Sequence, residues 1–188
     1  MTQDSPNLTN QFLIAMPGLE DPNFSRTVTY VCQHDAEGAM GVVINRPTRV
    51  TLDSVLEQME LETREAEVAT LPVYSGGPVN TERGFILHRP TGQWEASLSV
   101  GDDIALTSSR DILEAIALGA GPADRLMVLG YAGWQPGQLE QEMADNAWLS
   151  GPASAEVIFN TPPDERWQAA ARALGVDLTL LSSEAGHA

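Results

Sequence analysis

The residues of this chain best suited to bind a ligand lie in three polar loops shaped by glycine or proline. The first loop is Asn45-Arg46, which follows the apolar segment VVI and precedes Pro47. An amide and a guanidinium held at the end of a strand can project into a pocket and bind an anion there. Arg46 can equally pair with one of the many acids or bind backbone carbonyls, so the sequence leaves both roles open.

The second loop is the YSGGP turn that contains Ser75, Gly76 and Gly77. An exposed serine hydroxyl beside free N–H groups can form a small anion-binding nest. The same residues are typical of a tight turn that needs positive φ at glycine, and we favour that interpretation. All three residues remain candidates for binding a ligand or partner.

The third loop lies within the run LGYAGWQPGQLEQEMADNAWL, residues 129–149. Its glycines and its proline require special backbone dihedrals between a strand and a helix. Loops held by rigid elements on both sides often carry function. We take Tyr131, Trp134 and Gln138 as the candidate binding residues, although the tryptophans can simply bury apolar area.

No catalytic residue is predicted, because no nucleophile and base stand together in a known pattern. Cys32 lies in an apolar segment, which is typical of a small buried side chain, and it can act with His88 only if folding brings the two together. Cys32, His34 and Asp35 lack the spacing of a metal site. We therefore expect no metal and no cofactor.

The composition bears on the class of partner. The chain has 10 basic residues, all arginine, and 26 acidic ones, which gives a formal net charge of −16. The absence of lysine excludes Schiff-base catalysis and the phosphate-binding lysine of a P-loop. An acidic surface disfavours direct nucleic-acid binding. With no apolar run long enough for a membrane span and no signal peptide, we expect a cytoplasmic protein with an unknown protein or small-molecule partner.

The pattern of apolar residues predicts a mixed α+β domain, because strands cluster early and do not alternate strictly with helices. Helices are expected after Thr51, after Ser108 or Ser109, in the acidic part of the third loop and over 164–174. The expected strands are 12–16, 27–33, 40–45, 73–74, 83–88, 94–100, 103–107, 125–131, 156–160 and 178–181. Residues 34–38 are expected to form the longer loop of a hairpin.

The length of 188 residues fits one domain, residues 1–188, with a sizeable core. The acidic, weakly patterned segment 62–70 is predicted to be an insertion or a mobile loop. Residues 182–188 are expected to form a frayed tail.

Five segments in order closely resemble the YqgE/AlgH family of small bacterial proteins. They are FLIAMPGLEDPNFSRTV (12–28), HDAEGAMGVVINRP (34–47), YSGGPV (74–79), RGFILH (83–88) and the run of residues 129–149. The resemblance implies an α+β fold with mixed, largely antiparallel sheets in a bifurcated, barrel-like core flanked by helices. It also implies a cytosolic bacterial location, but no reaction, cofactor or set of site residues. Some members are named as transcriptional regulators of alginate production.

Our leading hypothesis is a non-enzymatic binding or regulatory module that acts through the three loops, which can form one surface if they converge. One alternative is a small-molecule enzyme with Arg46 as an anion clamp and Glu140 or Glu142 as the general acid or base. A further alternative is a transcription-linked or nucleic-acid-associated regulator, which requires several arginines on one face.

Overall fold

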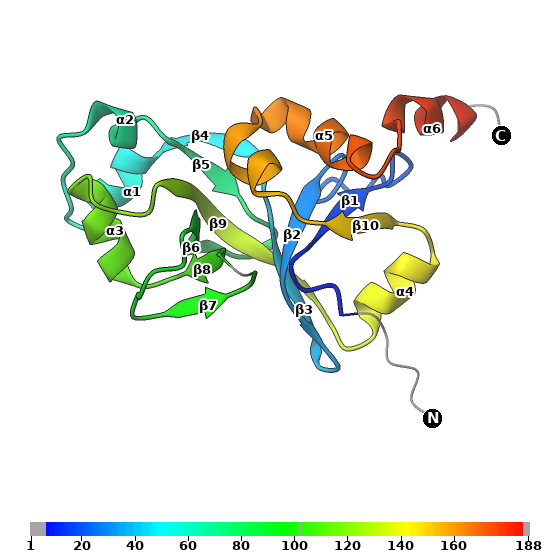
Figure 1. The fold of residues 1–188 in the computed structure, drawn as a ribbon, viewed down its shortest axis with the longest axis horizontal. Helices are drawn as coiled ribbons and strands as arrows, with labels where there is room; N and C mark the ends of the chain where they lie inside the picture. The colour runs from blue at the N-terminus through cyan, green and yellow to red at the C-terminus, as the bar shows by residue number, and fades with distance from the viewer. Residues whose placement is uncertain (1–6, 102, 186–188) are drawn as a thin grey trace. The chain divides into compact units, whose positions relative to one another are not determined.

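A computed structural model describes residues 7–101 and 103–185 and divides the chain into two compact units (Figure 1). The first unit comprises positions 1–45 and 132–188, and the second comprises positions 46–131. Whether the two units fold together as the single domain expected from the sequence stays a prediction.

The first unit is built on an antiparallel sheet. Its strands are β1 (Gln11–Ala15), β2 (Val28–Asp35), β3 (Gly38–Val43), β10 (Trp148–Pro152) and the last residues of β9 (Asp124–Trp134). Pairing joins β10 to β1, β1 to β2, β2 to β3, and β3 to residues 132–134 of β9. The expected longer loop at 34–38 is wrong: Asp35 pairs with Gly38, whose φ of +132° permits a turn of two residues.

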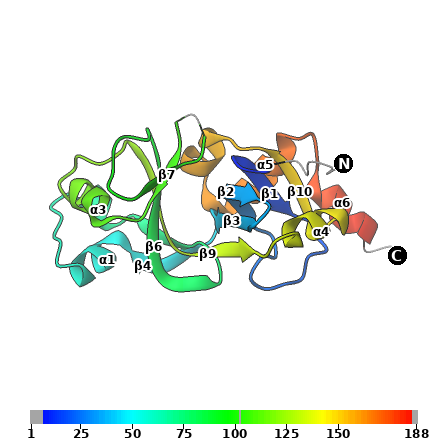
Figure 2. The same ribbon diagram turned by 90° about the horizontal axis from the view of Figure 1, so that it is seen from below.

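Helices cover the sheet of the first unit. They are α4 (Gln138–Ala144), a π-helix (Glu156–Asn160), a 3₁₀ turn (Pro163–Glu165), α5 (Arg166–Arg172) and α6 (Leu178–Ala185). Helix α5 packs on β1 and β2, and α4 packs on β3 and β10 (Figure 2). A core of buried side chains lies beneath α4 and includes Leu13, Val31, Trp134, Leu139 and Trp148.

The second unit combines one parallel strand pair with four antiparallel ones. Its strands are β4 (Pro47–Thr51), β5 (Pro72–Ser75), β6 (Val79–Arg89), β7 (Ser97–Ser99), β8 (Ala105–Thr107) and the first residues of β9. Strand β9 lies between β5, to which it is parallel, and β6; β8 and β7 follow beyond β6, and β4 pairs with β5.

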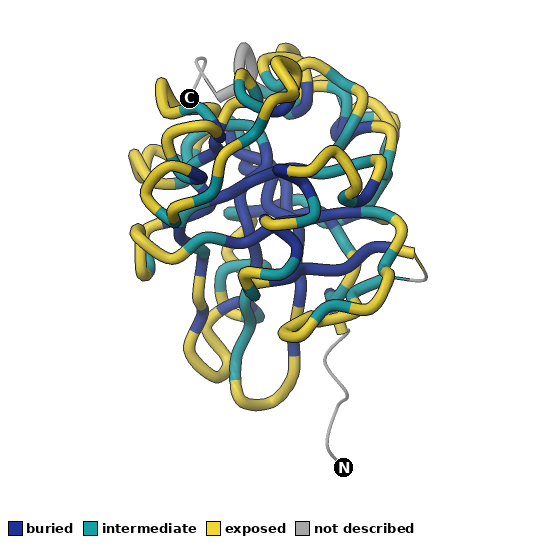
Figure 3. The backbone as a smooth tube through the Cα atoms, turned by 90° about the vertical axis from the view of Figure 1, so that its left-hand side faces the viewer, coloured by how far each residue is buried: buried dark blue, intermediate teal, exposed yellow. Residues whose placement is uncertain are grey.

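The helices of the second unit bury one apolar side each. They are α1 (Leu52–Gln58), α2 (Ala66–Ala69) and α3 (Arg110–Ala117). Their buried residues, among them Leu56, Val68 and Ile112, pack with Val73 and Met127 of the strands. Buried residues lie on the central strands and on the inner sides of the helices, while β4, β7 and most turns are exposed (Figure 3). The expected mixed α+β fold with largely antiparallel strands and flanking helices is confirmed.

Two predicted strands are wrong. Residues 156–160 form a π-helix, because Val157 and Ile158 are buried side by side and do not alternate as in a strand. Residues 178–181 begin α6: the Asp177 carboxylate accepts the N–H of Thr179 at 2.9 Å, a bond that starts a helix. Strand β10 is absent from the sequence prediction. Its last two residues, Gly-Pro, are typical of a turn, and the strand forms by pairing with β1.

Segment 62–70 contains α2, and its Val68 is 3% exposed within the core of the second unit. The predicted mobility of this segment stays a prediction. Residues 182–185 of the expected frayed tail continue α6, and residues 186–188 lie outside the described residues. Every described helix is too short or too polar to cross a bilayer.

Candidate functional site

The predicted binding residues are divided between the two units. Asn45, Trp134 and Gln138 belong to the first unit, and the other five belong to the second, namely Arg46, Ser75, Gly76, Gly77 and Tyr131. Their binding roles stay predictions, but the contacts of each residue show what it does for the fold.

Asn45 uses its side-chain amide within the first unit. Its Oδ1 accepts the N–H of Val28 at 3.0 Å, and its Nδ2 donates to the carbonyl of Arg26 at 2.9 Å. These two bonds fix the chain where β2 begins and where β3 has just ended. The amide is therefore engaged in positioning the strands.

The YSGGP turn lies beside Arg46 and β9 in the second unit. The N–H of Ser75 donates to the carbonyl of Arg46 at 2.9 Å, and the N–H of Gly76 donates to the carbonyl of Leu129 at 2.8 Å. Two of the donors that an anion nest requires are thus engaged by backbone carbonyls. Glycine is required at 76, because an added Cβ would lie 2.3 Å from the carbonyl oxygen of Gly130.

Replacing Gly76 with alanine is expected to lower the free energy of unfolding by roughly 1–3 kcal/mol, since two backbone segments must separate to admit the methyl group. Gly18→Ala is the matched control, because no atom lies within 4 Å of its added Cβ. Urea denaturation of both variants checks the prediction. Equal stabilities would contradict the close approach at Gly76.

Trp134 faces the core of the first unit. It is 6% exposed, stacks on Phe24 with ring centroids 6.2 Å apart, and meets Trp148 edge to face at 6.3 Å. Both indole N–H groups donate to the same oxygen, Oε1 of Glu142, at 3.2 and 3.0 Å. Gln138 donates to the other oxygen of Glu142 at 2.9 Å. These contacts give Trp134 and Gln138 a clear structural role.

Tyr131 also makes a packing contact, inside the second unit. Its ring meets that of Phe85 edge to face at 6.1 Å. The nucleic-acid alternative requires Arg26, Arg46, Arg49, Arg83 and Arg89 on one face. Of these, Arg83 lies over the Phe85 ring, and Arg89 pairs with Asp124 at 2.6 Å.

The pair Cys32 and His88 is satisfied separately in the two units. Cys32 is 2% exposed, as expected for a small buried side chain. His88 bonds the carbonyl of Pro90 through Nδ1 at 2.9 Å and the hydroxyl of Thr107 through Nε2 at 2.7 Å. Burial lowers the pKa of His88, against the opposing effect of the bond to Pro90. Both ring nitrogens are occupied within the second unit.

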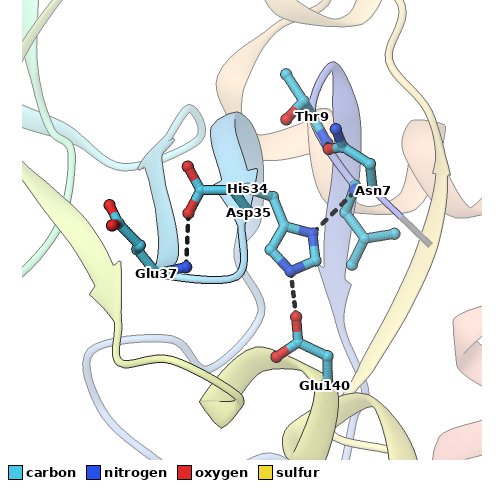
Figure 4. A network of polar contacts seen from close by, with 7 residues as sticks. Asn7, Thr9, His34, Asp35, Glu37 and Glu140 are labelled. Atoms are coloured by element: carbon cyan, nitrogen blue, oxygen red, sulfur yellow. Dashed lines mark hydrogen bonds and ion pairs between the residues drawn. The ribbon is translucent and has the colours of Figure 1, made fainter. Parts of the chain in front are cut away.

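Sequence reasoning missed a contact between His34 of β2 and Glu140 of α4. Nε2 of His34 hydrogen-bonds Oε1 of Glu140, and Nδ1 accepts the N–H of Leu8 at 3.0 Å (Figure 4). Because Nδ1 is the acceptor, the neutral imidazole carries its proton on Nε2 and donates it to the carboxylate. The side chain of His34 is 3% exposed and that of Glu140 is 31% exposed.

The glycine–proline corner of the third loop positions Glu140. Gly137 takes φ +78° and accepts the N–H of Gln141 at 3.1 Å, which starts α4. Leu139, 1% exposed, anchors the helix in the core. Because residues two apart on a helix point in different directions, Glu142 reaches the tryptophans while Glu140 reaches His34.

A pocket of about 350 Å³ opens beside this contact. Its lining comes from the segment before β1, from β1, β2 and β10, and from α4: Asn7, Leu8, Gln11, His34, Glu140, Met143 and Ser150. The volume is at the lower end of the range for small-molecule sites. A single carboxylate, several neutral polar groups and an apolar patch can bind a small ligand in one orientation.

The environment of Glu140 favours its charged form. Partial burial raises the pKa of this carboxyl, but the hydrogen bond from His34 and a backbone hydrogen bond outweigh it and lower the pKa. The carboxylate is therefore ionised at neutral pH. The enzyme alternative combined this carboxyl, or that of Glu142, with Arg46, which belongs to the other unit.

The lowered pKa of Glu140 makes its contribution to stability dependent on pH. The folded state binds the proton less readily than the unfolded state, so the contribution is complete above the unfolded pKa of about 4.3 and declines as pH falls through the lower folded value. The difference in unfolding free energy between the wild type and Glu140→Gln is expected to stay constant from about pH 7 to pH 5 and to shrink between about pH 5 and pH 3. Urea denaturation across that range checks it, and a difference that grows on acidification would contradict the assigned contact.

The comparisons with known proteins concern nearly the whole chain. A family model described as AlgH-like matches residues 12–179. A UPF0301 protein of Thioalkalivibrio sulfidiphilus is 61% identical over 98% of each chain, and one of Methylococcus capsulatus is 54% identical over the full length of both. The solution structure of the AlgH protein from Pseudomonas aeruginosa, UPF0301, is 50% identical, with a TM-score of 0.80 and full coverage of both chains. A crystal structure of a protein from Corynebacterium diphtheriae, 22% identical, shares the fold, with a TM-score of 0.74 and coverage of 97% and 94%.

Proposed function

The chain belongs to the AlgH-like family, and we propose that it is a cytoplasmic, non-enzymatic binding or regulatory module that takes a small ligand beside Glu140. One observation carries the proposal: the pocket of about 350 Å³ contains a carboxylate held in place from one side by a buried histidine. A carboxylate oriented before the ligand arrives lowers the entropic cost of binding.

The hydrogen bonds of His34 favour binding over catalysis. A general base needs a free nitrogen within reach of the proton that it removes. Nδ1 of His34 accepts the N–H of Leu8, and Nε2 contacts Glu140. Ser150 also lines the pocket, but no hydrogen bond within the described chain joins its hydroxyl to the imidazole. Among the described residues that line the pocket, Ser150 and His34 therefore do not form a nucleophile–base pair.

A ligand in this pocket lies against the segment that precedes β1. Leu8 lines the pocket with its neighbour Asn7, and Leu8 is 7% exposed as a residue and belongs to the core of the first unit. A ligand that contacts this segment alters the contacts that hold it before β1. A partner protein that binds one arrangement of this segment better than the other responds to such a change, and a binding module regulates in this way.

Of the three loops predicted to bind a ligand, only the third contributes to this pocket. The corner from Trp134 to Gln138 positions α4 and thereby Glu140. For the remaining candidates (Asn45, Arg46, Ser75, Gly76, Gly77 and Tyr131), a role in binding a ligand or partner stays a prediction that the ligand pocket does not require.

Equilibrium dialysis against a bacterial small-molecule extract, read by mass spectrometry, tests the proposal. The wild type is expected to retain at least one compound about tenfold more strongly than Glu140→Gln, because a hydrogen bond to a charged group contributes about 1.5–3 kcal/mol. Glu57→Gln is the matched control, since it removes the same charge from an exposed position of α1. Equal retention by all three proteins, or no retained compound, would contradict the proposal.

A further inference from the structure

The charge inside the pocket comes from one side chain. Among the described residues that line it, His34 and Glu140 are the ones with ionisable side chains. Nδ1 of His34 accepts the N–H of Leu8, so this nitrogen carries no proton in the structure. The lining therefore presents one net negative charge. An anionic ligand is repelled there, and the formal charge of −16 on the whole chain adds to that repulsion.

Glu140 keeps one oxygen available for a ligand. Oε1 is engaged by His34, the backbone N–H of Glu140 itself also bonds to the carboxylate, and no other side chain of the described residues does so. Figure 4 shows the second oxygen turned away from the imidazole ring. An ionised carboxylate oxygen in a partly buried site binds a charged N–H donor more strongly than a neutral one.

The rest of the lining favours a short aliphatic chain. Leu8 and Met143 supply apolar surface, and Gln11 and Ser150 supply neutral polar groups. Methionine adapts its flexible thioether chain to ligands of different shape. A volume of about 350 Å³ corresponds to the space of about twelve liquid water molecules, which suits a compact ligand.

We infer that the pocket binds a primary alkylammonium ion, with the ammonium group on Oε2 of Glu140 and the alkyl chain against Leu8 and Met143. This inference rests on the proposed function and adds the chemical class of its ligand. The ammonium ion supplies three donors to a site whose polar groups beyond the carboxylate can accept them. Its alkyl chain covers the apolar side of the pocket.

The test is a titration of the ¹⁵N-labelled protein with three probes of matched length, n-butylammonium, 1-butanol and butyrate, followed by amide chemical shifts. Butylammonium is expected to shift the amides of Leu8, Gln11 and Ser150 at a concentration about tenfold lower than butanol. Butyrate is expected to leave these amides unshifted. Glu140→Gln should abolish the preference for the ammonium probe, while Glu57→Gln should retain it.

The outcomes separate the ligand class from the function. Butanol or butyrate shifting the pocket amides as readily as butylammonium overturns the ammonium inference and leaves a binding pocket in place. Shifts that butylammonium spreads equally over both units, or that persist in Glu140→Gln, show surface attraction to an acidic protein and also overturn it. Dialysis that retains no compound through Glu140 contradicts the proposed function itself. The three-probe comparison in the wild type stands even if Glu140→Gln fails to fold.

Discussion

Cys32 of the folded protein is expected to react with iodoacetamide at about pH 8 roughly a thousandfold more slowly than in the unfolded chain. The thiol is fully enclosed in β2, and burial raises its pKa from 9.0 to about 12. Three pKa units lower the thiolate fraction about a thousandfold, and the thiolate is the reactive form. Its S–H also lies 3.6 Å from the carbonyl of Tyr30, to which it donates.

Mass spectrometry of the alkylated protein, with and without guanidinium chloride, measures the two rates. The chain has one cysteine, so the increase in mass on alkylation reports on Cys32 alone. Comparable rates in the folded and unfolded states would show an accessible thiol. That result would reopen the interpretation of Cys32 as a nucleophile.

Replacing Glu142 with alanine is expected to lower the free energy of unfolding by about 3 kcal/mol. Its Oε1 accepts both indole N–H groups of Trp134 and Trp148, which are 6% and 3% exposed as residues. Removing the acceptor leaves two largely buried donors unpaired, and each unpaired buried donor costs about 1–3 kcal/mol. The carboxylate therefore fixes both tryptophans and, through Gln138, the first turn of α4.

Urea denaturation followed by tryptophan fluorescence measures this loss. Glu142→Gln is the matched variant: it keeps an acceptor oxygen of the same reach and is expected to lose less than half as much. An alanine variant within about 0.5 kcal/mol of the wild type would show that the indoles find other acceptors.

The fold could be predicted from the sequence where local patterns and tertiary packing agree. Helix α3 is an example: Ser109 precedes it, Ile112 and Ile116 are buried on one side, and Gly119 ends it with φ +78°. The π-helix at 156–160 and the start of α6 were mistaken for strands because their β-branched and leucine residues also suit strands. Tertiary packing favours the π-helix at 156–160, and the Asp177 cap favours the helix at 178.

The candidate site could be predicted only in part. The sequence indicated the run that contains Glu140 as a candidate binding loop, and it indicated His34 as a residue with a reactive side chain. It could not join them, because 106 positions separate the two residues and only the pairing of strands places β2 beside α4. The helix dipole already explains acidic residues at the start of a helix. The sequence therefore could not distinguish the roles of Glu140 and Glu142.

The central claim is that the first unit binds a small ligand at Glu140. It is tested most directly by recording amide ¹H–¹⁵N spectra of the protein with the compound that dialysis retains. The account predicts the largest shifts at Leu8, Gln11, His34 and Ser150, all lost in Glu140→Gln and kept in Glu57→Gln. Shifts confined to the second unit, around Ser75 to Gly77, would contradict it and would place the ligand at the YSGGP turn instead.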